Sequence, residues 1–317
     1  MSEKKLLYQE HISLQDKSWF KVGGPARWYV EPTTPEEFQD ALLFAKQKNL
    51  AIFMLGEGAN ILISDDGFDG IVIRPHLKNI TRSTYDQNHE LVTAQAGVSC
   101  AELITYCLSH NLIGLEEFSG IPGTVGGSVY INIHYFNFLL SQFLVSAEVI
   151  EKATGEIHVV DNAWFCFGYD QSKLFEQEYY LVSATFKVKK TTELEAAYAR
   201  GRHDEMIRYR SYRYPNQRTC GSFFRNFHKE EVEHARSDKK LIYVAYYLDK
   251  LGIKGELQIG GARISYQHAN MLVTEEGAKA QDVVLLVRKM QELVYTEFGI
   301  MPQPECQFVG FKEYPLL

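Results

Sequence analysis

The sequence predicts an α+β protein built from two domains. Its 317 residues are enough for two hydrophobic cores, and an apolar fraction of 45% is ordinary for a soluble protein. The N-terminal quarter reads strand–helix–strand–strand, and the last third reads as a separate α+β unit. Two glycine-rich loops interrupt the chain, and neither has the form that a doubly wound dinucleotide-binding sheet requires.

Capping residues mark the first elements of the chain. Thr34 and Pro35 open a predicted helix in which Glu37 completes a capping box, and Asn49 ends it. Short apolar runs bounded by turn residues predict strands at 27–30, 51–55 and 71–74.

A second group of elements begins near residue 90. Ser99 and Glu102 form another capping box, which opens a helix that runs to about Asn111. The strands predicted around it are 92–96, 147–151, 157–160 and 179–187, and a charged helix is predicted at 193–208.

The last third contains two predicted helices, 239–251 and 281–298. The second is the clearest amphipathic helix of the chain, because its apolar residues keep one face and belong in a core. We expect a domain of residues 1–206, with subdomains of about 1–80 and 81–206, and a second domain of residues 207–317.

Composition and charge exclude several classes of function. A net charge of −7 and a pI near 5.8 argue against nucleic acid or an anionic membrane as the main partner. No apolar run reaches the length of a membrane span, and no signal-type segment is found. The five cysteines are scattered and form no CxxC pair, so we expect neither a disulfide framework nor a metal site. A reduced, cytoplasmic location fits best.

The two glycine-rich loops are the main candidates for a ligand site. Residues 56–60 follow a predicted strand and lead into another strand rather than into a helix. Residues 120–127 contain four glycines in eight positions, so backbone N–H groups can approach a ligand closely, and Pro122 stiffens this loop. These features suit a diphosphate, although a tight turn between buried strands is the alternative. Two such loops predict a cofactor laid across a domain and held from two sides.

Six motifs, in order, give the chain a clear resemblance to a known family. Over about residues 19–310 it resembles the UDP-N-acetylenolpyruvoylglucosamine reductases, the MurB family of bacterial cell-wall synthesis. The motifs are Phe20-Lys21-Val22-Gly23-Gly24-Pro25-Ala26, Leu55-Gly56-Glu57-Gly58-Ala59-Asn60, Gly120-Ile121-Pro122-Gly123-Thr124-Val125-Gly126-Gly127, Cys220-Gly221-Ser222-Phe223-Phe224-Arg225-Asn226, His268-Ala269-Asn270 and Pro304-Glu305-Cys306. Ala59 stands where the family usually has serine.

The resemblance implies an FAD-binding domain of the vanillyl-alcohol-oxidase (PCMH) type, made of two α+β subdomains, and a C-terminal α+β substrate-binding domain. It implies that UDP-N-acetylglucosamine enolpyruvate is reduced to UDP-N-acetylmuramate with NADPH as the hydride donor, in peptidoglycan precursor synthesis. The FAD-binding positions that it implies are Gly56, Glu57, Gly58, Ala59, Asn60, Gly120, Ile121, Gly123, Thr124, Gly126 and Gly127.

Two residues match the catalytic positions of the family. Ser222 matches the proton donor, although a serine after glycine is otherwise typical of a turn. Glu305 matches the glutamate that assists protonation, and Pro302 and Pro304 hold it in place; the alternative is a solvated loop carboxylate.

A third catalytic position departs from the family. Asp170 stands where the resemblance implies an arginine, and an aspartate would repel a substrate carboxylate. Either a cation arrives from elsewhere, Lys173 being nearest in sequence, or the chemistry is impaired. The loop at 133–137 also replaces small family residues by bulky ones. Within it, His134 reads as a packing residue or as a polar residue near the flavin.

Substrate-binding candidates come from both sides of the Ser222 motif. Asn226, Arg213, Arg210 and Tyr169 are the positions predicted to bind the UDP-sugar, since arginine forks bind diphosphates well. Arg202, Arg208 and Arg218 could equally form a solvated face. The alternatives to an active reductase are a catalytically impaired flavin- or UDP-sugar-binding relative, or a flavoenzyme of the same fold with another substrate. Oligomeric state stays open.

Overall fold

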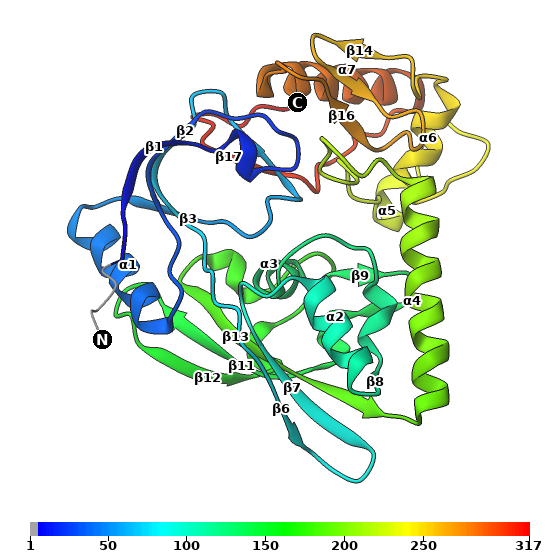
Figure 1. The fold of residues 1–317 in the computed structure, drawn as a ribbon. Helices are drawn as coiled ribbons and strands as arrows, with labels where there is room; N and C mark the ends of the chain where they lie inside the picture. The colour runs from blue at the N-terminus through cyan, green and yellow to red at the C-terminus, as the bar shows by residue number, and fades with distance from the viewer. Residues whose placement is uncertain (1–5) are drawn as a thin grey trace. The chain divides into compact units, whose positions relative to one another are not determined.

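The computed structural model describes residues 6–317 (Figure 1). The chain forms two compact units. The first unit contains residues 6–10, 28–57 and 70–209, and the second contains residues 11–27, 58–69 and 210–317. The chain passes from one unit to the other within the strands β1 (Gln9–Ser13), β2 (Pro25–Val30) and β5 (Phe68–Ile73) and within helix α4 (Glu193–Arg213). It also passes between Glu57 and Gly58, in the first glycine-rich loop.

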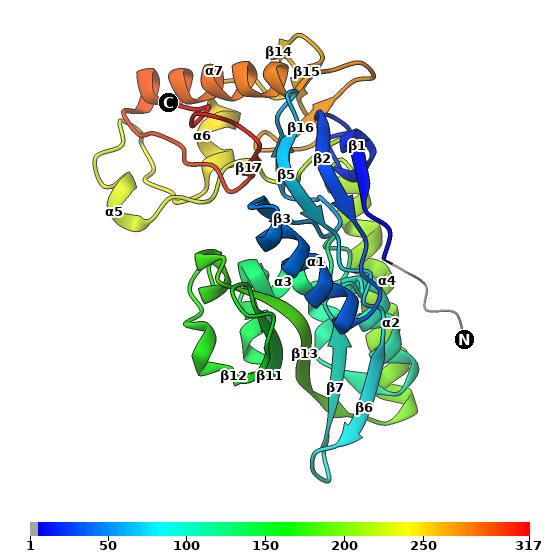
Figure 2. The ribbon, with the colours of Figure 1, turned by 90° about the vertical axis from the view of Figure 1, so that its left-hand side faces the viewer.

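The first unit is built on a six-stranded sheet. Five strands follow the order β12-β11-β13-β7-β6, and β8 pairs with the end of β13. All these pairings are antiparallel, and β7 and β13 register Ala94 opposite Ala184. Figure 2 shows β6, β7 and β13 as long neighbouring ribbons. The bounds are β6 Ile80–Thr84, β7 His89–Gln95, β8 Leu112–Ile113, β11 Leu144–Glu151, β12 Ile157–Asp161 and β13 Tyr179–Lys190.

Two helices cover this sheet, and a hydrophobic core lies between the helices and the sheet. They are α2 (Cys100–Ser109) and α3 (Val125–Ile131), and α3 packs on β13 and β7. Val92, Val129 and Phe186 are fully buried in this core. The capping box of α2 is confirmed: the Glu102 N–H donates to Ser99 Oγ (3.1 Å), and the Ser99 N–H donates to Glu102 Oε2 (2.7 Å).

Helix α1 (Pro35–Gln47) and a second sheet form a smaller layer. The strand order of this sheet is β1-β2-β5-β3, and β3 (Ala51–Met54) runs parallel to β5. Thr34 caps α1 by accepting the Glu37 N–H (3.2 Å). The rest of the predicted box is wrong, because the Glu37 carboxylate accepts the N–H of Thr33 (2.6 Å) instead of the N–H of Thr34.

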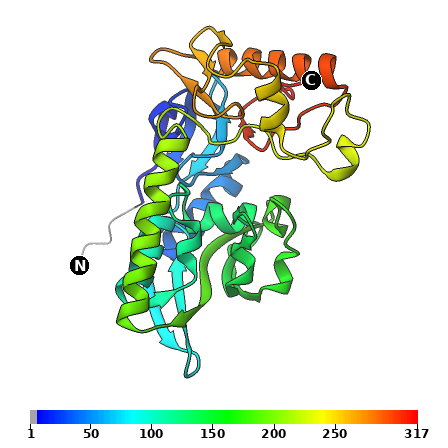
Figure 3. The ribbon, with the colours of Figure 1, turned by 90° about the vertical axis from the view of Figure 1, so that its right-hand side faces the viewer.

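Helix α4 is long (Figure 3). Its residues are mostly polar. It continues to Arg213 instead of ending at the predicted Arg208. The short elements of the first unit are β9 (His134–Tyr135), β10 (Phe138–Leu139), η2 (Leu115–Phe118), η3 (Leu140–Gln142), η4 (Ala163–Phe165) and η5 (Lys173–Glu176).

The second unit packs helix α7 (Ala280–Phe298) on a three-stranded meander of order β14-β15-β16. The apolar stripe of α7 is buried as predicted, and the carboxylate of Asp65 caps the helix by accepting the N–H groups of Ala280 (2.8 Å) and Gln281 (3.0 Å). The other bounds are η1 Gln15–Lys17, β4 Ile61–Ile63, α5 Lys229–Val232, α6 Val244–Lys250, β14 Gln258–Ile259, β15 Ala262–Ile264, β16 Leu272–Thr274 and β17 Gln307–Val309.

The predicted helix at 239–251 is too long at its start. Helix α6 begins only at Val244, because the backbone before it is extended and the Ile242 carbonyl accepts the N–H of Phe227 (2.8 Å). Within residues 6–317, no helix is both long enough and apolar enough to cross a membrane.

Candidate active site

Gly56 of the first glycine-rich loop meets Thr124 of the second loop, and both residues belong to the first unit. A Cβ added to Gly56 would lie 2.8 Å from Thr124 Oγ1, so only glycine allows this approach. Gly120 and Gly123 have φ of +76° and +146°, which glycine adopts readily. The second loop is not a turn between strands, since it leads into the short helix α3.

Donors remain open where the loops meet. The N–H groups of Gly56, Gly123 and Thr124 make no hydrogen bond to any of residues 6–317. By contrast, the N–H groups of Gly126 and Gly127 are already bonded, to Ala96 O (2.9 Å) and to Thr124 Oγ1 (3.2 Å). Bare backbone with unused donors fits the diphosphate of a dinucleotide cofactor, whereas Gly126 serves close packing.

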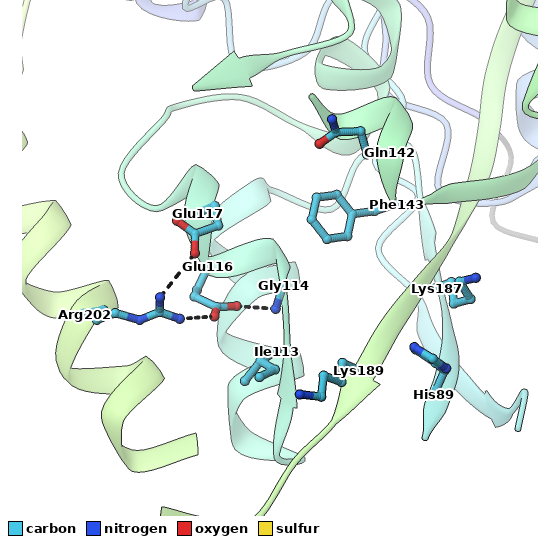
Figure 4. A pocket seen from close by; sticks show the side chains of 10 residues that line it. All are labelled: His89, Ile113, Gly114, Glu116, Glu117, Gln142, Phe143, Lys187, Lys189 and Arg202. Carbon is cyan, nitrogen blue, oxygen red and sulfur yellow. Dashed lines mark hydrogen bonds and ion pairs between the residues drawn. The ribbon is translucent and has the colours of Figure 1, made fainter. Parts of the chain in front are cut away.

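An ion-pair cluster anchors the segment that leads into the second loop (Figure 4). The Arg202 guanidinium donates to Glu116 Oε1 (2.7 Å) and Glu117 Oε1 (3.3 Å), and the other Glu116 oxygen accepts the Gly114 N–H (2.5 Å). Glu116 is only 3% exposed, and burial raises the pKa of the Glu117 carboxyl. Arg202 therefore has two carboxylate partners, although 57% of its side chain is exposed. Sequence reasoning missed this anchor, because its partners are far apart along the chain.

In the second unit, Ser222 and Glu305 lie on neighbouring backbone segments that Phe223 connects. The Phe223 N–H donates to Asn270 O (2.8 Å), and the Phe223 carbonyl accepts the Glu305 N–H (2.8 Å). Ser222 itself forms a β-bridge with Met271. The two predicted catalytic residues are thus brought together by one extended segment.

Asn270 holds that segment with its side chain. Its amide accepts the Phe224 N–H (3.0 Å) and donates to the Phe224 carbonyl (2.7 Å), and Asn270 is 4% exposed. A buried amide that satisfies both backbone groups of one residue fixes a segment that has no helix or long strand to fix it. Its place in the His268-Ala269-Asn270 motif is the sequence signal that marks this residue.

Asn60 links the first glycine-rich loop to Glu305 within the second unit. Its Nδ2 donates to the Glu305 carbonyl (3.3 Å), and its own carbonyl accepts the Gln307 N–H (3.1 Å) at the start of the parallel β4–β17 pair. The Asn60 Oδ1 is buried and has no hydrogen-bond partner among residues 6–317. Such an orphaned acceptor fits a bound group that supplies a donor.

The predicted substrate residues of the second unit occupy two places. Arg210 and Arg213 lie over the Tyr214 ring, at 5.1 and 5.6 Å from its centroid, and Tyr214 meets His268 edge to face. Burial, together with the charge of Arg213, lowers the pKa of His268 to about 4. The Asn226 carbonyl accepts a hydrogen bond from Arg225 Nη1 (2.9 Å). Of the other arginines, Arg208 pairs with Glu205 and Arg218 donates to the Glu275 carbonyl.

The segment with the missing arginine lies beside the unusual loop. Asp170 pairs with His134, at 3.1 Å between Oδ1 and Nδ1, and the Tyr169 ring lies 4.6 Å from the His134 ring. Lys173 does not replace the arginine, because its Nζ lies over the Trp164 ring, 4.7 Å from the centroid.

Comparison with known proteins agrees with this arrangement. The family model for an FAD binding domain matches residues 26–161, and the model for the C-terminal domain of UDP-N-acetylenolpyruvoylglucosamine reductase matches residues 213–309. The α+β fold with an FAD-binding domain and a reductase-type C-terminal domain is therefore confirmed.

Relatives match over most of their length. A protein of Trichormus variabilis named UDP-N-acetylenolpyruvoylglucosamine reductase is 32% identical to this chain, and the match covers 97% of this chain and 90% of the relative. A protein of the same name from Gloeobacter violaceus is also 32% identical, and the match covers 95% of this chain and 96% of the relative. The crystal structure of the reductase MurB from Thermus caldophilus has a TM-score of 0.74 at 27% identity and covers 96% of this chain and 99% of that one. The chain, which carries an FAD-binding domain, thus belongs to the UDP-N-acetylenolpyruvoylglucosamine reductases, a family of oxidoreductases of peptidoglycan synthesis.

Proposed function

We propose that this chain reduces UDP-N-acetylglucosamine enolpyruvate to UDP-N-acetylmuramate, with NADPH as the hydride donor. The observation that carries the proposal is the joint placement of Ser222 and Glu305 around Phe223, braced by Asn270. A reduction of this kind needs an acid group beside the reacting carbon and a second polar group to assist it. Ser222 and Glu305 supply these groups from two neighbouring segments that Phe223 connects.

The cofactor in this proposal is FAD, held at its diphosphate by the N–H groups of Gly56, Gly123 and Thr124. When bound, FAD supplies the redox chemistry by accepting a hydride from NADPH and passing it to the β carbon of the enolpyruvyl group. The unused donors and the bare approach at Gly56 support this role.

The remaining steps belong to side chains of the protein. The Ser222 hydroxyl delivers a proton to the α carbon, which completes the addition of two hydrogens across the double bond, and Glu305 stabilises the intermediate and assists this proton transfer. Arg210, Arg213 and Asn226 are proposed to bind the UDP-sugar, together with Tyr169.

Ser222→Ala tests the proposal. We expect the variant to keep reduction of its flavin by NADPH and to lose turnover by about 100-fold or more, because the donor acts only in the second half-reaction. Ser83→Ala, on exposed strand β6, is the matched control and should behave as wild type. Turnover that survives in Ser222→Ala would refute the role assigned to this serine.

A catalytically impaired relative is the second candidate. Asp170 favours it, because a carboxylate replaces the expected cation. We also infer a cytoplasmic location, which five free thiols support.

A further inference from the structure

Helix α7 carries a fully buried polar side chain on its apolar face. Gln291 is 0% exposed and lies among apolar residues of the same stripe, such as Met290 and Val294, which belong to the core of the second unit. A buried amide destabilises the fold unless its polar atoms are hydrogen-bonded. Both ends of the Gln291 amide are bonded, each to the backbone of a different segment of the second unit.

These two bonds fix the orientation of the amide. The Gln291 Nε2 donates to the Pro302 carbonyl (2.9 Å), and the Oε1 accepts the Leu317 N–H (3.2 Å). A flipped amide would place its oxygen against the Pro302 carbonyl and its NH₂ group against the Leu317 N–H, so both bonds would be lost. The Leu317 N–H therefore ensures that the donor end of the amide faces Pro302.

The segment of residues 315–317 is itself attached to α7. Arg288 lies one helical turn before Gln291, and its Nε donates to the Pro315 carbonyl (2.6 Å). Leu316 is buried in the core of the second unit. The C-terminal end of the ribbon lies beside α7 in Figure 1 and in Figure 2. A docked segment thus delivers the N–H that orients Gln291.

Pro302 begins the short segment that leads to Glu305. Pro302 is buried, and neither Pro302 nor Pro304 has an N–H group. Each proline ring fixes φ at about −65°, so few rotations are free between Pro302 and Glu305. A shift of the Pro302 carbonyl is therefore passed on to Glu305 instead of being absorbed between the two residues.

This segment is held from two sides. On one side the backbone of residues 223–225 bonds to it, for example through the Phe223 carbonyl, which accepts the Glu305 N–H (2.8 Å). On the other side α7 holds the Pro302 carbonyl through the Gln291 amide. Without this amide, the buried Pro302 carbonyl would lose its donor and the α7 side of the segment would be released.

We infer that Gln291, oriented by the 315–317 segment, is a positioning residue for the Glu305 carboxylate. This inference rests on the proposed function, in which Glu305 stabilises the intermediate and assists proton transfer. Misplacement of a reacting group by about 1 Å can cost up to about 100-fold in rate. Because Gln291 is fully buried, no ligand touches it, and it acts on the reaction only through the segment that carries Glu305.

The first test separates the two half-reactions of the FAD-loaded protein. Gln291→Leu removes the amide and nearly keeps the side-chain volume. We expect reduction of the flavin by NADPH at the wild-type rate, and a limiting rate of reoxidation by the enolpyruvyl substrate that is lower by about 10-fold. The half-saturating concentration of that substrate should stay within about 2-fold of wild type, since Gln291 does not bind it.

Two more variants complete this test. Leu317→Pro removes the N–H that orients the amide and leaves the core intact, because Leu317 is 57% exposed. It should slow reoxidation by about 3-fold. Gln39→Leu is the matched control, since the Gln39 amide also donates to a remote carbonyl, that of Gly155 (2.8 Å), but in the first unit. It should leave both half-reactions unchanged. Wild-type reoxidation in both Gln291→Leu and Leu317→Pro would overturn the inference.

A double-mutant cycle tests whether Gln291 acts through Glu305. In the Glu305→Gln background, Gln291→Leu should slow reoxidation by less than about 2-fold, because the carboxylate that it positions is already absent. A purely structural role would lower the rate by the same factor in both backgrounds, and that result would contradict the inference. The proposed function fails separately, namely when the enolpyruvyl substrate does not reoxidise the reduced wild-type flavin at all.

Discussion

Replacing Asn270 by alanine tests how the Ser222 segment is held. The change removes an amide that bonds both backbone groups of Phe224, a residue that is 1% exposed. No helix or long strand replaces these bonds, because Ser222 and Phe224 take part only in isolated bridges, to Met271 and Pro304.

The magnitude follows from the two groups left unpaired. An unsatisfied buried N–H or C=O costs about 1–3 kcal/mol, so the variant should lose about 3 kcal/mol of unfolding free energy if water satisfies part of the site. The Phe223–Glu305 hydrogen bond depends on the same segment. We therefore expect kcat to fall by about 10-fold beyond the loss of stability.

Urea unfolding and steady-state kinetics would measure the two effects. Asn162→Ala is the matched control, since its amide also makes two backbone bonds, to the carbonyls of Ser141 (2.7 Å) and Leu144 (2.9 Å), but in the first unit. It should lose comparable stability and keep kcat. An Asn270→Ala protein with wild-type stability and kcat would refute the reasoning.

Three further predictions concern the loops and the histidine. Arg202→Met leaves the buried Glu116 carboxylate without its cation, so it should lower stability by about 2 kcal/mol and weaken FAD binding, measured by thermal unfolding and by flavin-fluorescence titration. Gly56→Ala puts a Cβ 2.8 Å from Thr124 Oγ1 and should lower FAD affinity by about 10-fold in the same titration. The pKa of His268 is about 4 in the folded chain and 6.5 ordinarily, so the unfolded state binds more protons between pH 4 and pH 6.5. The free energy of unfolding should therefore fall by up to about 3 kcal/mol from pH 6.5 to pH 4. Urea unfolding of His268→Gln should lack this loss.

Matched variants separate these effects from general damage. Arg208→Met breaks a pair that is exposed on both sides, so its stability should stay near wild type. Gly201→Ala adds a Cβ that meets no atom within 4 Å, and FAD affinity should be unchanged. If Arg202→Met or Gly56→Ala behaves like its control, the corresponding account of the loops is wrong.

Local signals in the sequence predicted much of the fold. The Ser99–Glu102 capping box and the apolar stripe of α7 depend on residues a few positions apart, and both are confirmed. The helical pattern at 239–251 did not predict the extended backbone before α6. The Ile242 carbonyl there accepts the Phe227 N–H, a long-range hydrogen bond that a local pattern does not reveal. The short helix α3 escaped it as well, since its glycines have low helix propensity.

Long-range pairings account for what the sequence could not show. Residues 58–69 belong to the second unit because β4 pairs with β17, which lies near the other end of the chain. The contact of Asn60 with Glu305 follows from the same pairing. In the sequence, Asp170 and His134 are two departures from the family pattern. The folded chain shows that their side chains are in contact, at 3.1 Å between Oδ1 and Nδ1.

The most direct test of the central claim is anaerobic stopped-flow absorbance of the FAD-loaded protein. NADPH would be added first, and the enolpyruvyl UDP-sugar second, while the flavin band is followed. We predict bleaching by NADPH and then recovery whose rate rises with the concentration of the enolpyruvyl substrate. A flavin that bleaches but recovers no faster with this substrate than without it would contradict the proposed reductase activity.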